Sequence, residues 1–239
     1  MRGSVAEDAV VVNVSGTARH CAGNCLVLQS SGTETRFLGE NGFLRYRLLQ
    51  GAQAMAEAKV TAMFTAPGVV DFGVGAANGA GQRAKELGAG RAFIVTDRGV
   101  CNAGLLARLT SALDGAGVAY EVWDAVQPNP TDKDVTAGVE AFRKTDCQVV
   151  VALGGGSPLD AAKGIALMAT HGGKIQDYDA AVRGWEKVKP TIPPLIAIPT
   201  TAGTGSEMSA AAIITDTSRN VKMIVASPFL KPRVALLDP

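Results

Sequence analysis

Three consecutive glycines at 154–156 follow an apolar run at 149–153 and precede a helical pattern. The run contains three β-branched valines, which favour a buried strand over a helix. Glycine has no Cβ to hold a ligand away from the backbone. We predict Ser157 as the N-cap, Pro158 as the first helical residue and Asp160 in the first turn. Free N–H groups at such a helix start, together with its dipole, favour an anion, and we expect a diphosphate. A strand–helix turn without a ligand is the alternative.

An acidic residue, Asp97, ends a second apolar run, FIVT. Its carboxylate could accept hydrogen bonds from an adenosine ribose and repel an additional phosphate on that ribose, which predicts NAD in preference to NADP. The alternative is a helix N-cap, and both roles can hold together. In the usual dinucleotide fingerprint the glycines precede the acid by about twenty residues. Here the acid comes first, which indicates a different way of binding a dinucleotide.

A hydroxyl-rich loop, PTTAGTGSE at 199–207, follows another apolar run. Its Thr200, Thr201, Thr204 and Ser206 offer O–H groups that suit phosphate, ribose or a carboxamide. A polar turn without a function does not explain four hydroxyls between two strands, so we favour a binding loop. Lys222, further along, could reach a phosphate or ribose, or could be a solvated strand residue.

The segment 73–79, GVGAANG, nearly matches the G-x-G-x-x-G fingerprint. Asn78 stands at the position of the third glycine, and no acid follows at the expected distance. We therefore favour a turn before a helix over a phosphate contact.

Candidate groups for stabilising an alkoxide are scarce, although hydride transfer from an alcohol requires a metal ion or a general base. His171 falls in a polar stretch, and we expect it at the surface. His20 with Cys21 and Cys25 resembles half of a metal site, but no second half follows. The sequence predicts no metal ligands and no assigned catalytic residue in this chain.

The elements that position these residues alternate between strands and helices. Strands are expected at 69–72, 92–96, 118–123, 149–153, 195–198 and 234–237, and helices at 76–87, 100–113, 132–144 and 158–168. This alternation predicts an α/β fold with a Rossmann-like parallel sheet flanked by helices. Two further apolar stretches, 210–215 and 221–226, predict an antiparallel hairpin attached to that sheet. Open sheets of this kind bind ligands beyond the carboxyl ends of their strands, where the residues above are expected to meet.

Residues 1–60 differ from the rest. Short apolar runs at 9–14 and 25–28 lie among Gly, Ser, Thr and Asn, and only 43–59 has helical periodicity. We expect 1–42 to be poorly ordered or to be an extension that does not belong to the fold. The predicted division is an atypical N-terminal extension, 1–60, and a dinucleotide-binding domain, 61–239.

The composition excludes several classes of partner. The 23 basic and 22 acidic side chains give a net charge of +1, which offers no electrostatic footprint for nucleic acid or an acidic membrane. No apolar run approaches the roughly eighteen residues of a membrane span, and the N-terminus lacks a signal-peptide core. The four cysteines have no paired metal spacing, which fits idle thiols in a reducing cytoplasm.

Residues 64–239 closely resemble the N-terminal nucleotide-binding domain of the iron-containing (group III) alcohol dehydrogenases. The motifs that carry the resemblance are FGVGA (72–76), IVTDRG (94–99), QPNPT (127–131), ALGGGSPLDAAK (152–163), IPTTAGTGSEMS (198–209) and LLDP (236–239). The resemblance implies that Gly155, Gly156, Ser157 and Asp160 meet the diphosphate and nicotinamide half, that Asp97 and Asn129 lie at the adenosine end, and that Thr200, Thr201, Thr204, Ser209 and Lys222 line the cofactor.

The resemblance also implies oxidation of small alcohols, or reduction of aldehydes and ketones, with NAD and a divalent metal such as iron or zinc. The family's metal ligands, one Asp and three His, belong to a helical second domain after the LLDP motif, which we expect to be absent from 1–239. The chain is therefore expected to be the cofactor-binding half of a cytoplasmic, homo-oligomeric (dimeric) dehydrogenase. A truncated, non-catalytic dinucleotide-binding module is one alternative, and a member of the related glycerol dehydrogenase and dehydroquinate synthase group is another.

Overall fold

The computed structural model describes residues 8–12, 18–22, 28–30, 33–35 and 66–239, and the chain divides into two compact units, 1–65 and 66–239. The described residues of the first unit form two antiparallel pairs: β1 (Asp8–Val12) with β2 (Ala18–Ala22), and β3 (Leu28–Ser30) with β4 (Thr33–Thr35). The helix expected at 43–59 lies outside the described residues. The predicted division into 1–60 and 61–239 stays a prediction.

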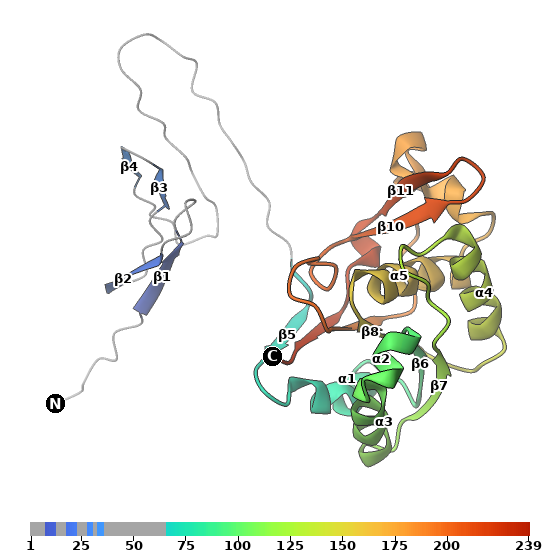
Figure 1. Ribbon diagram of the computed structural model, residues 1–239, viewed down its shortest axis with the longest axis horizontal. Coiled ribbons are helices and arrows are strands. Elements are labelled where there is room, and N and C mark those ends of the chain that lie inside the picture. Colours follow the sequence, from blue (N-terminus) through green and yellow to red (C-terminus); the bar gives the residue numbers. More distant parts are fainter. Residues whose placement is uncertain (1–7, 13–17, 23–27, 31–32, 36–65) are drawn as a thin grey trace, which may run out of the picture. The chain divides into compact units, whose positions relative to one another are not determined.

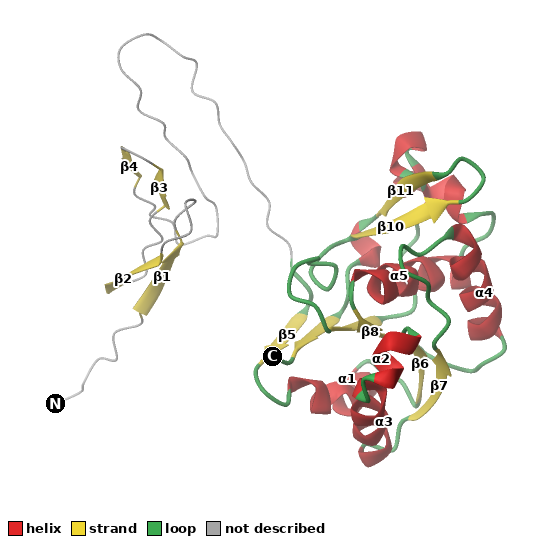
Figure 2. Ribbon diagram, viewed as in Figure 1, coloured by secondary structure: helices red, strands yellow, loops and turns green. Residues whose placement is uncertain are grey.

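The second unit is built on a six-stranded sheet in the order β5-β12-β9-β8-β6-β7, in which every neighbouring pair is parallel (Figures 1 and 2). Its strands are β5 (Val69–Phe72), β6 (Arg91–Val95), β7 (Ala119–Trp123), β8 (Val149–Gly154), β9 (Leu195–Pro199) and β12 (Val234–Leu237). All six predicted strands are confirmed to within two residues. The central strand β8 is buried along its whole length, as its continuous apolar run requires.

The strand order reverses between β6 and β8. From β6 the chain passes outward to the edge strand β7, whereas from β8 it passes in the opposite direction to β9 and then to β12. Neighbouring connections that leave in opposite directions open a crevice at the carboxyl ends of the two strands, where ligands of open α/β sheets bind. Asp97 follows β6 and the glycine turn follows β8, so both lie at this reversal.

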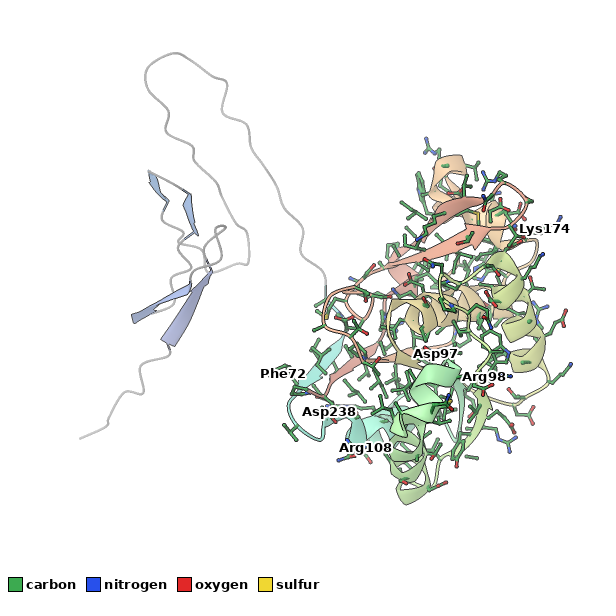
Figure 3. The ribbon with its side chains drawn as sticks, viewed as in Figure 1. Phe72, Asp97, Arg98, Arg108, Lys174 and Asp238 are labelled. Carbon is green, nitrogen blue, oxygen red and sulfur yellow. The ribbon has the colours of Figure 1, made fainter. Side chains whose placement is uncertain are left out.

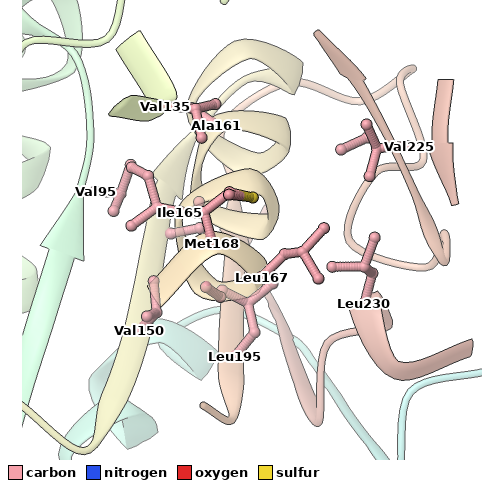
Figure 4. Packing of buried hydrophobic residues seen from close by; sticks show 14 of the residues in the cluster. Val95, Val135, Val150, Ala161, Ile165, Leu167, Met168, Leu195, Val225 and Leu230 are labelled. Atoms are coloured by element: carbon pink, nitrogen blue, oxygen red, sulfur yellow. The ribbon is translucent and has the colours of Figure 1, made fainter. Parts of the chain in front are cut away.

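Helices cover both faces of the sheet, because alternate side chains of each strand point to opposite sides. One face packs against α1 (Ala80–Glu86), α2 (Arg98–Asn102) and α3 (Leu105–Gly115). The other packs against α4 (Asp132–Arg143) and the 15-residue helix α5 (Gly156–Thr170). Figure 4 shows Ile165 and Leu167 of α5 among Val150 and Leu195 of the sheet.

Two predicted helices are divided in the structure. The helix expected at 76–87 is a 3₁₀ turn, η1 (Ala76–Gly79), followed by α1, and the helix expected at 100–113 is α2 followed by α3. Gly104, at φ +77°, separates α2 from α3 because a left-handed residue cannot continue a right-handed helix.

The antiparallel hairpin that the sequence predicts beside the parallel sheet is confirmed. Strands β10 (Ala211–Asp216) and β11 (Val221–Ala226) form their own antiparallel pair, apart from the six-stranded sheet. The hairpin lies beside α5 (Figure 1). Its Ile214 and Val225 join the core there, so burial of their apolar side chains holds the hairpin in place.

The stretch 171–193 holds three 3₁₀ turns, η2 (Ile175–Tyr178), η3 (Ala180–Val182) and η4 (Gly184–Lys187), and a fourth, η5 (Pro228–Leu230), precedes β12. Across the described ranges, no helix combines the length and apolar character that a membrane span requires.

Candidate functional site

A cavity of about 340 Å³ opens where the N-terminal end of α5, the loop 200–210 and the hairpin meet. Volumes of this size accommodate small ligands or part of a larger one. Eight of the residues that the sequence analysis singles out line it together: Asn129, Gly156, Ser157, Asp160, Thr204, Ser206, Ser209 and Lys222. The structure thus brings together side chains that are up to 93 positions apart in the sequence.

The glycine turn joins two of the predicted motifs directly. Gly154 pairs in register with Pro199 of β9, and its carbonyl accepts a hydrogen bond from the Thr200 N–H at 2.9 Å. Gly154 also has φ +147°, a conformation that L side chains rarely adopt. The register therefore sets the start of the hydroxyl loop beside the glycines.

The backbone of the turn forms a cradle that side chains would fill. A Cβ on Gly155 would lie 3.2 Å from Thr201 Oγ1, and one on Gly156 would lie 3.0 Å from Thr204 Cγ2. Helix α5 begins at Gly156 with Gly155 as its N-cap, so the predicted N-cap, Ser157, is one of its first-turn residues instead. First-turn N–H groups have no acceptor within the helix, and here they face a loop rich in hydroxyls. The residues present fit the diphosphate of a dinucleotide.

Asn129 and Lys222 form one wall of the cavity. Lys222 Nζ donates to Asn129 Oδ1 at 2.9 Å, and the Asn129 N–H donates to Ser157 Oγ at 3.2 Å. Asn129 adopts φ +56°, a left-handed conformation that asparagine tolerates better than most residues. These contacts tie β11 to the loop before α4 and to the start of α5.

Asp160 does not lie in the first helical turn and its carboxylate is already engaged. Its Oδ1 accepts from Ser206 Oγ at 2.6 Å, and its Oδ2 accepts from the Ile213 N–H at 3.0 Å. Since α5 begins two residues earlier than predicted, Asp160 falls in the second turn. It lines the cavity while holding the loop and the hairpin to α5.

Sequence reasoning missed Lys163 as a candidate site residue. Its side chain is buried, and Nζ donates to Ser206 Oγ at 2.8 Å and to the Ala211 carbonyl at 2.6 Å. Burial lowers the pKa of Lys163 to about 8, although the nearby Asp160 and Glu207 carboxylates oppose that shift. A single lysine within the otherwise apolar run AAKGIALMA was the available signal, because lysine is rarely buried without a partner.

The remaining loop residues hold different positions. Ser209 lines the cavity and its Oγ accepts from the Ala211 N–H at 3.0 Å, whereas Thr200 and Thr201 lie against the glycine turn and are not among the cavity's lining residues.

Asp97 caps α2, the alternative that the sequence left open beside ribose binding. Its Oδ1 accepts from the Val100 N–H at 2.9 Å, and Figure 3 shows it next to Arg98. Asp97 does not line the cavity of Asn129, so the structure does not bring together the two residues expected at the adenosine end. Its position after β6 places it on the carboxyl edge of the sheet.

The segment 73–79 is a turn before a helix, as favoured from the sequence. The carboxylate of Asp238 accepts hydrogen bonds from the N–H groups of Gly75 at 2.9 Å and Ala77 at 3.2 Å. A residue of the chain itself therefore takes the place that a phosphate would need.

His171 was expected at the surface, and this was wrong. It is buried, with Nε2 accepting from the Lys189 N–H at 2.8 Å and Nδ1 lying 3.0 Å from the Leu167 carbonyl. Both ring nitrogens are engaged with the backbone, and the ring packs edge-to-face on Tyr178. Its position is that of a structural core histidine.

Metal donors do not gather in the part of the chain that the structure describes: there, no three or more His, Cys, Asp or Glu side chains are placed to hold one ion. The described residues thus do not fit a divalent metal centre. The half-site His20–Cys21–Cys25 lies outside the side chains described, while Cys147 is buried and Cys101 is partly exposed.

Comparison with known proteins gives consistent matches. The family model "Iron-containing alcohol dehydrogenase" matches residues 67–239. The NAD-dependent methanol dehydrogenase of Bacillus methanolicus is 41% identical over 180 residues, which cover 75% of this chain and 46% of that protein. The choline dehydrogenase of Bacillus subtilis (strain 168) is 40% identical over 176 residues, covering 74% and 44%.

Among solved structures, a sulfoacetaldehyde reductase from Bifidobacterium kashiwanohense in complex with NAD+ superimposes with a TM-score of 0.68 at 33% identity. The match covers 74% of this chain and 46% of that one. The chain spans less than half the length of these relatives, and it corresponds to their N-terminal half.

Proposed function

The chain belongs to the iron-containing alcohol dehydrogenase family, as its motifs predicted, and from this membership we propose that it forms the NAD-binding half of an alcohol dehydrogenase. The observation that carries the proposal is the cavity in which the glycine turn, the hydroxyl loop and Lys222 meet at the carboxyl ends of the strands. This is the edge at which open α/β sheets bind nucleotides.

In this proposal the backbone at Gly155 and Gly156 and the Ser157 hydroxyl hold the diphosphate. The ammonium of Lys222 adds a positive charge to the same cavity, and Thr204 and Ser209 orient the nicotinamide-side ribose. Asp97, at the end of β6, receives the adenosine ribose and disfavours NADP by charge repulsion. Bound NAD supplies the acceptor for a hydride, and the chain's own residues bind and orient it.

Small alcohols, or the corresponding aldehydes and ketones, are the proposed substrates. Relatives that match this chain are named for methanol, choline and 1,3-propanediol. The described residues offer no donor set for the metal that the family name implies, so no catalytic residue is assigned. A cytoplasmic location and a homo-oligomer complete the proposal.

A non-catalytic dinucleotide-binding module is the second candidate. The scarcity of metal donors among the described residues favours it for the polypeptide 1–239 by itself. The coding sequence beyond residue 239 distinguishes the two candidates: a helical segment with Asp-x-x-x-His and two later histidines would support the enzyme.

Calorimetric titration of the purified chain with NAD and NADP tests the proposal. We expect saturable binding of one NAD per chain and weaker binding of NADP. The same sample, with iron or zinc added, is expected to turn over no short-chain alcohol. A chain that binds neither dinucleotide would refute the proposed function, and metal-dependent turnover by a pure sample would show that the active site has been misplaced.

A further inference from the structure

A carboxylate lines the cavity that we assign to an anion. Asp160 stands on the wall beside Gly156 and Ser157, where the diphosphate is expected, and Glu207 follows Ser206 in the adjoining loop. Like charges repel at short range, so an anion site with these neighbours needs a compensating positive charge.

The buried ammonium of Lys163 supplies such a charge from behind the wall. Nζ lies 3.7 Å from Asp160 Oδ1, and the Ser206 hydroxyl connects the two, accepting from Lys163 and donating to Asp160. Lys163 itself does not line this cavity, whereas Ser206 and Asp160 do. It therefore acts on a ligand only through these two residues.

Asp160, Lys163 and Ser206 lie on elements that must be held in place around the cavity. Asp160 and Lys163 are one turn apart on α5, and Ser206 belongs to the hydroxyl loop. The contacts to the Ala211 carbonyl and the Ile213 N–H extend the network into β10. One buried network thus fixes helix, loop and hairpin around the cavity.

We infer that Lys163 is a positioning residue of the dinucleotide site, which neutralises Asp160 on the cavity wall and fixes Ser206 without touching the ligand. The inference rests on the proposed function. NAD affinity is accordingly tied to the protonated state of Lys163.

The direction of the pH effect follows from the groups around the ammonium. Asp160 faces it from α5 and Glu207 from the loop, and Glu207 Oε2 is buried with no hydrogen-bond partner among residues 66–239. Lys231 and Arg233 share a second cavity, of about 400 Å³, with Lys163. Deprotonation leaves both carboxylates uncompensated, so NAD affinity falls as pH rises through about 8, approaching a tenfold loss per pH unit.

Stability shifts in the opposite direction, which separates this role from a merely structural one. The pKa of Lys163 is lowered in the folded chain, so between about pH 8 and 10.5 the unfolded chain binds more protons. The contribution of Lys163 to stability therefore rises with pH over the range in which affinity falls.

The test is calorimetric titration of the full chain with NAD from pH 7 to 9.5, with thermal unfolding measured in the same buffers. We expect the wild type to lose about 30-fold in affinity over this range, because the protonated fraction of a group with a pKa of about 8 falls by that factor between pH 7 and 9.5. Lys163→Met should bind at least tenfold more weakly at pH 7 and show a flat profile. Lys163→Arg should restore affinity with a flat profile, because arginine stays protonated. Lys85→Met, the same change at an exposed position of α1, should match the wild type.

A wild-type affinity that is constant from pH 7 to 9.5 overturns the inference, even where Lys163→Met does not fold. So does a folded Lys163→Met that binds NAD with the wild-type profile. Ser206→Ala provides an independent arm, because it removes the connecting hydroxyl and should weaken NAD binding while leaving Lys163 and Asp160 in place. Absence of NAD binding by the wild type at every pH would instead refute the proposed function, and the inference with it.

Discussion

Replacing Gly156 with valine should abolish NAD binding and leave the fold intact. Gly156 is the first residue of α5, and its Cβ position faces the cavity, with Thr204 Cγ2 at 3.0 Å as the nearest heavy atom. A valine there places two further methyl groups in the space proposed for the diphosphate. Helical propensity does not oppose the change, since valine is a better helix former than glycine.

The magnitude follows from the donors that the side chain would block. Pro158 has no N–H, so the first turn of α5 offers the N–H groups of Gly156 and Ser157. Hydrogen bonds to a charged group contribute about 1.5–3 kcal/mol each. Losing both costs about 3–6 kcal/mol, which is a loss of at least about 100-fold in affinity at about 1.4 kcal/mol per tenfold.

Calorimetric titration and circular dichroism of the same samples separate binding from folding. Gly156→Ala should give an intermediate loss, because it adds only the Cβ. Gly115→Val is the matched control: this glycine ends α3, and a Cβ there meets no heavy atom within 4 Å. Undiminished NAD affinity in a folded Gly156→Val would show that the glycines form only a turn and would refute the reasoning.

Three further substitutions test individual contacts. Asp97→Ser keeps an N-cap but removes the charge, so the preference for NAD over NADP should shrink by about 1–4 kcal/mol, which is the repulsion of two unit charges at about 4 Å. Titration with both cofactors measures this preference. An unchanged preference would contradict the placement of Asp97 at the adenosine ribose. Asp238→Ala leaves the Gly75 N–H without its acceptor and should lower the free energy of unfolding by about 1–2 kcal/mol in urea, while a neutral result would mean that water replaces the carboxylate. His171→Phe deprives the Lys189 N–H of its acceptor and should lower the free energy of unfolding by about 1–3 kcal/mol. NAD affinity should not change, because His171 follows the C-terminal end of α5 and the cavity lies at the N-terminal end of that helix. A weaker NAD complex would indicate a functional role for this histidine.

The residue pattern alone predicted the fold class and each strand of the sheet. Runs such as 149–153 are apolar because both faces of a parallel strand are buried. This requirement acts on consecutive residues, so a buried strand can be identified from its own sequence. Glycine at 154–156 was likewise interpretable, since a close backbone approach and a positive φ leave few other choices. The motifs around them identified the family.

Helix boundaries could be predicted less accurately from the sequence. The sequence places the start of α5 at Pro158 because serine and proline are preferred there, yet in the structure the N-cap is Gly155 and the helix begins at Gly156. The division of α2 from α3 depends on Gly104 adopting a left-handed conformation, which the apolar pattern does not reveal.

Only the tertiary structure decided how the site is assembled. The strand order places the ends of β6 and β8 at a reversal, and no local pattern specifies which strands become neighbours. Lys222 meets Asn129 because the hairpin packs on α5, and Lys163 meets Ser206 because the hydroxyl loop lies against the same helix. The sequence determines residue chemistry and local periodicity, whereas pairing between distant segments depends on which apolar faces become buried together. The burial of His171 could not be inferred from the sequence because it depends on such a pairing.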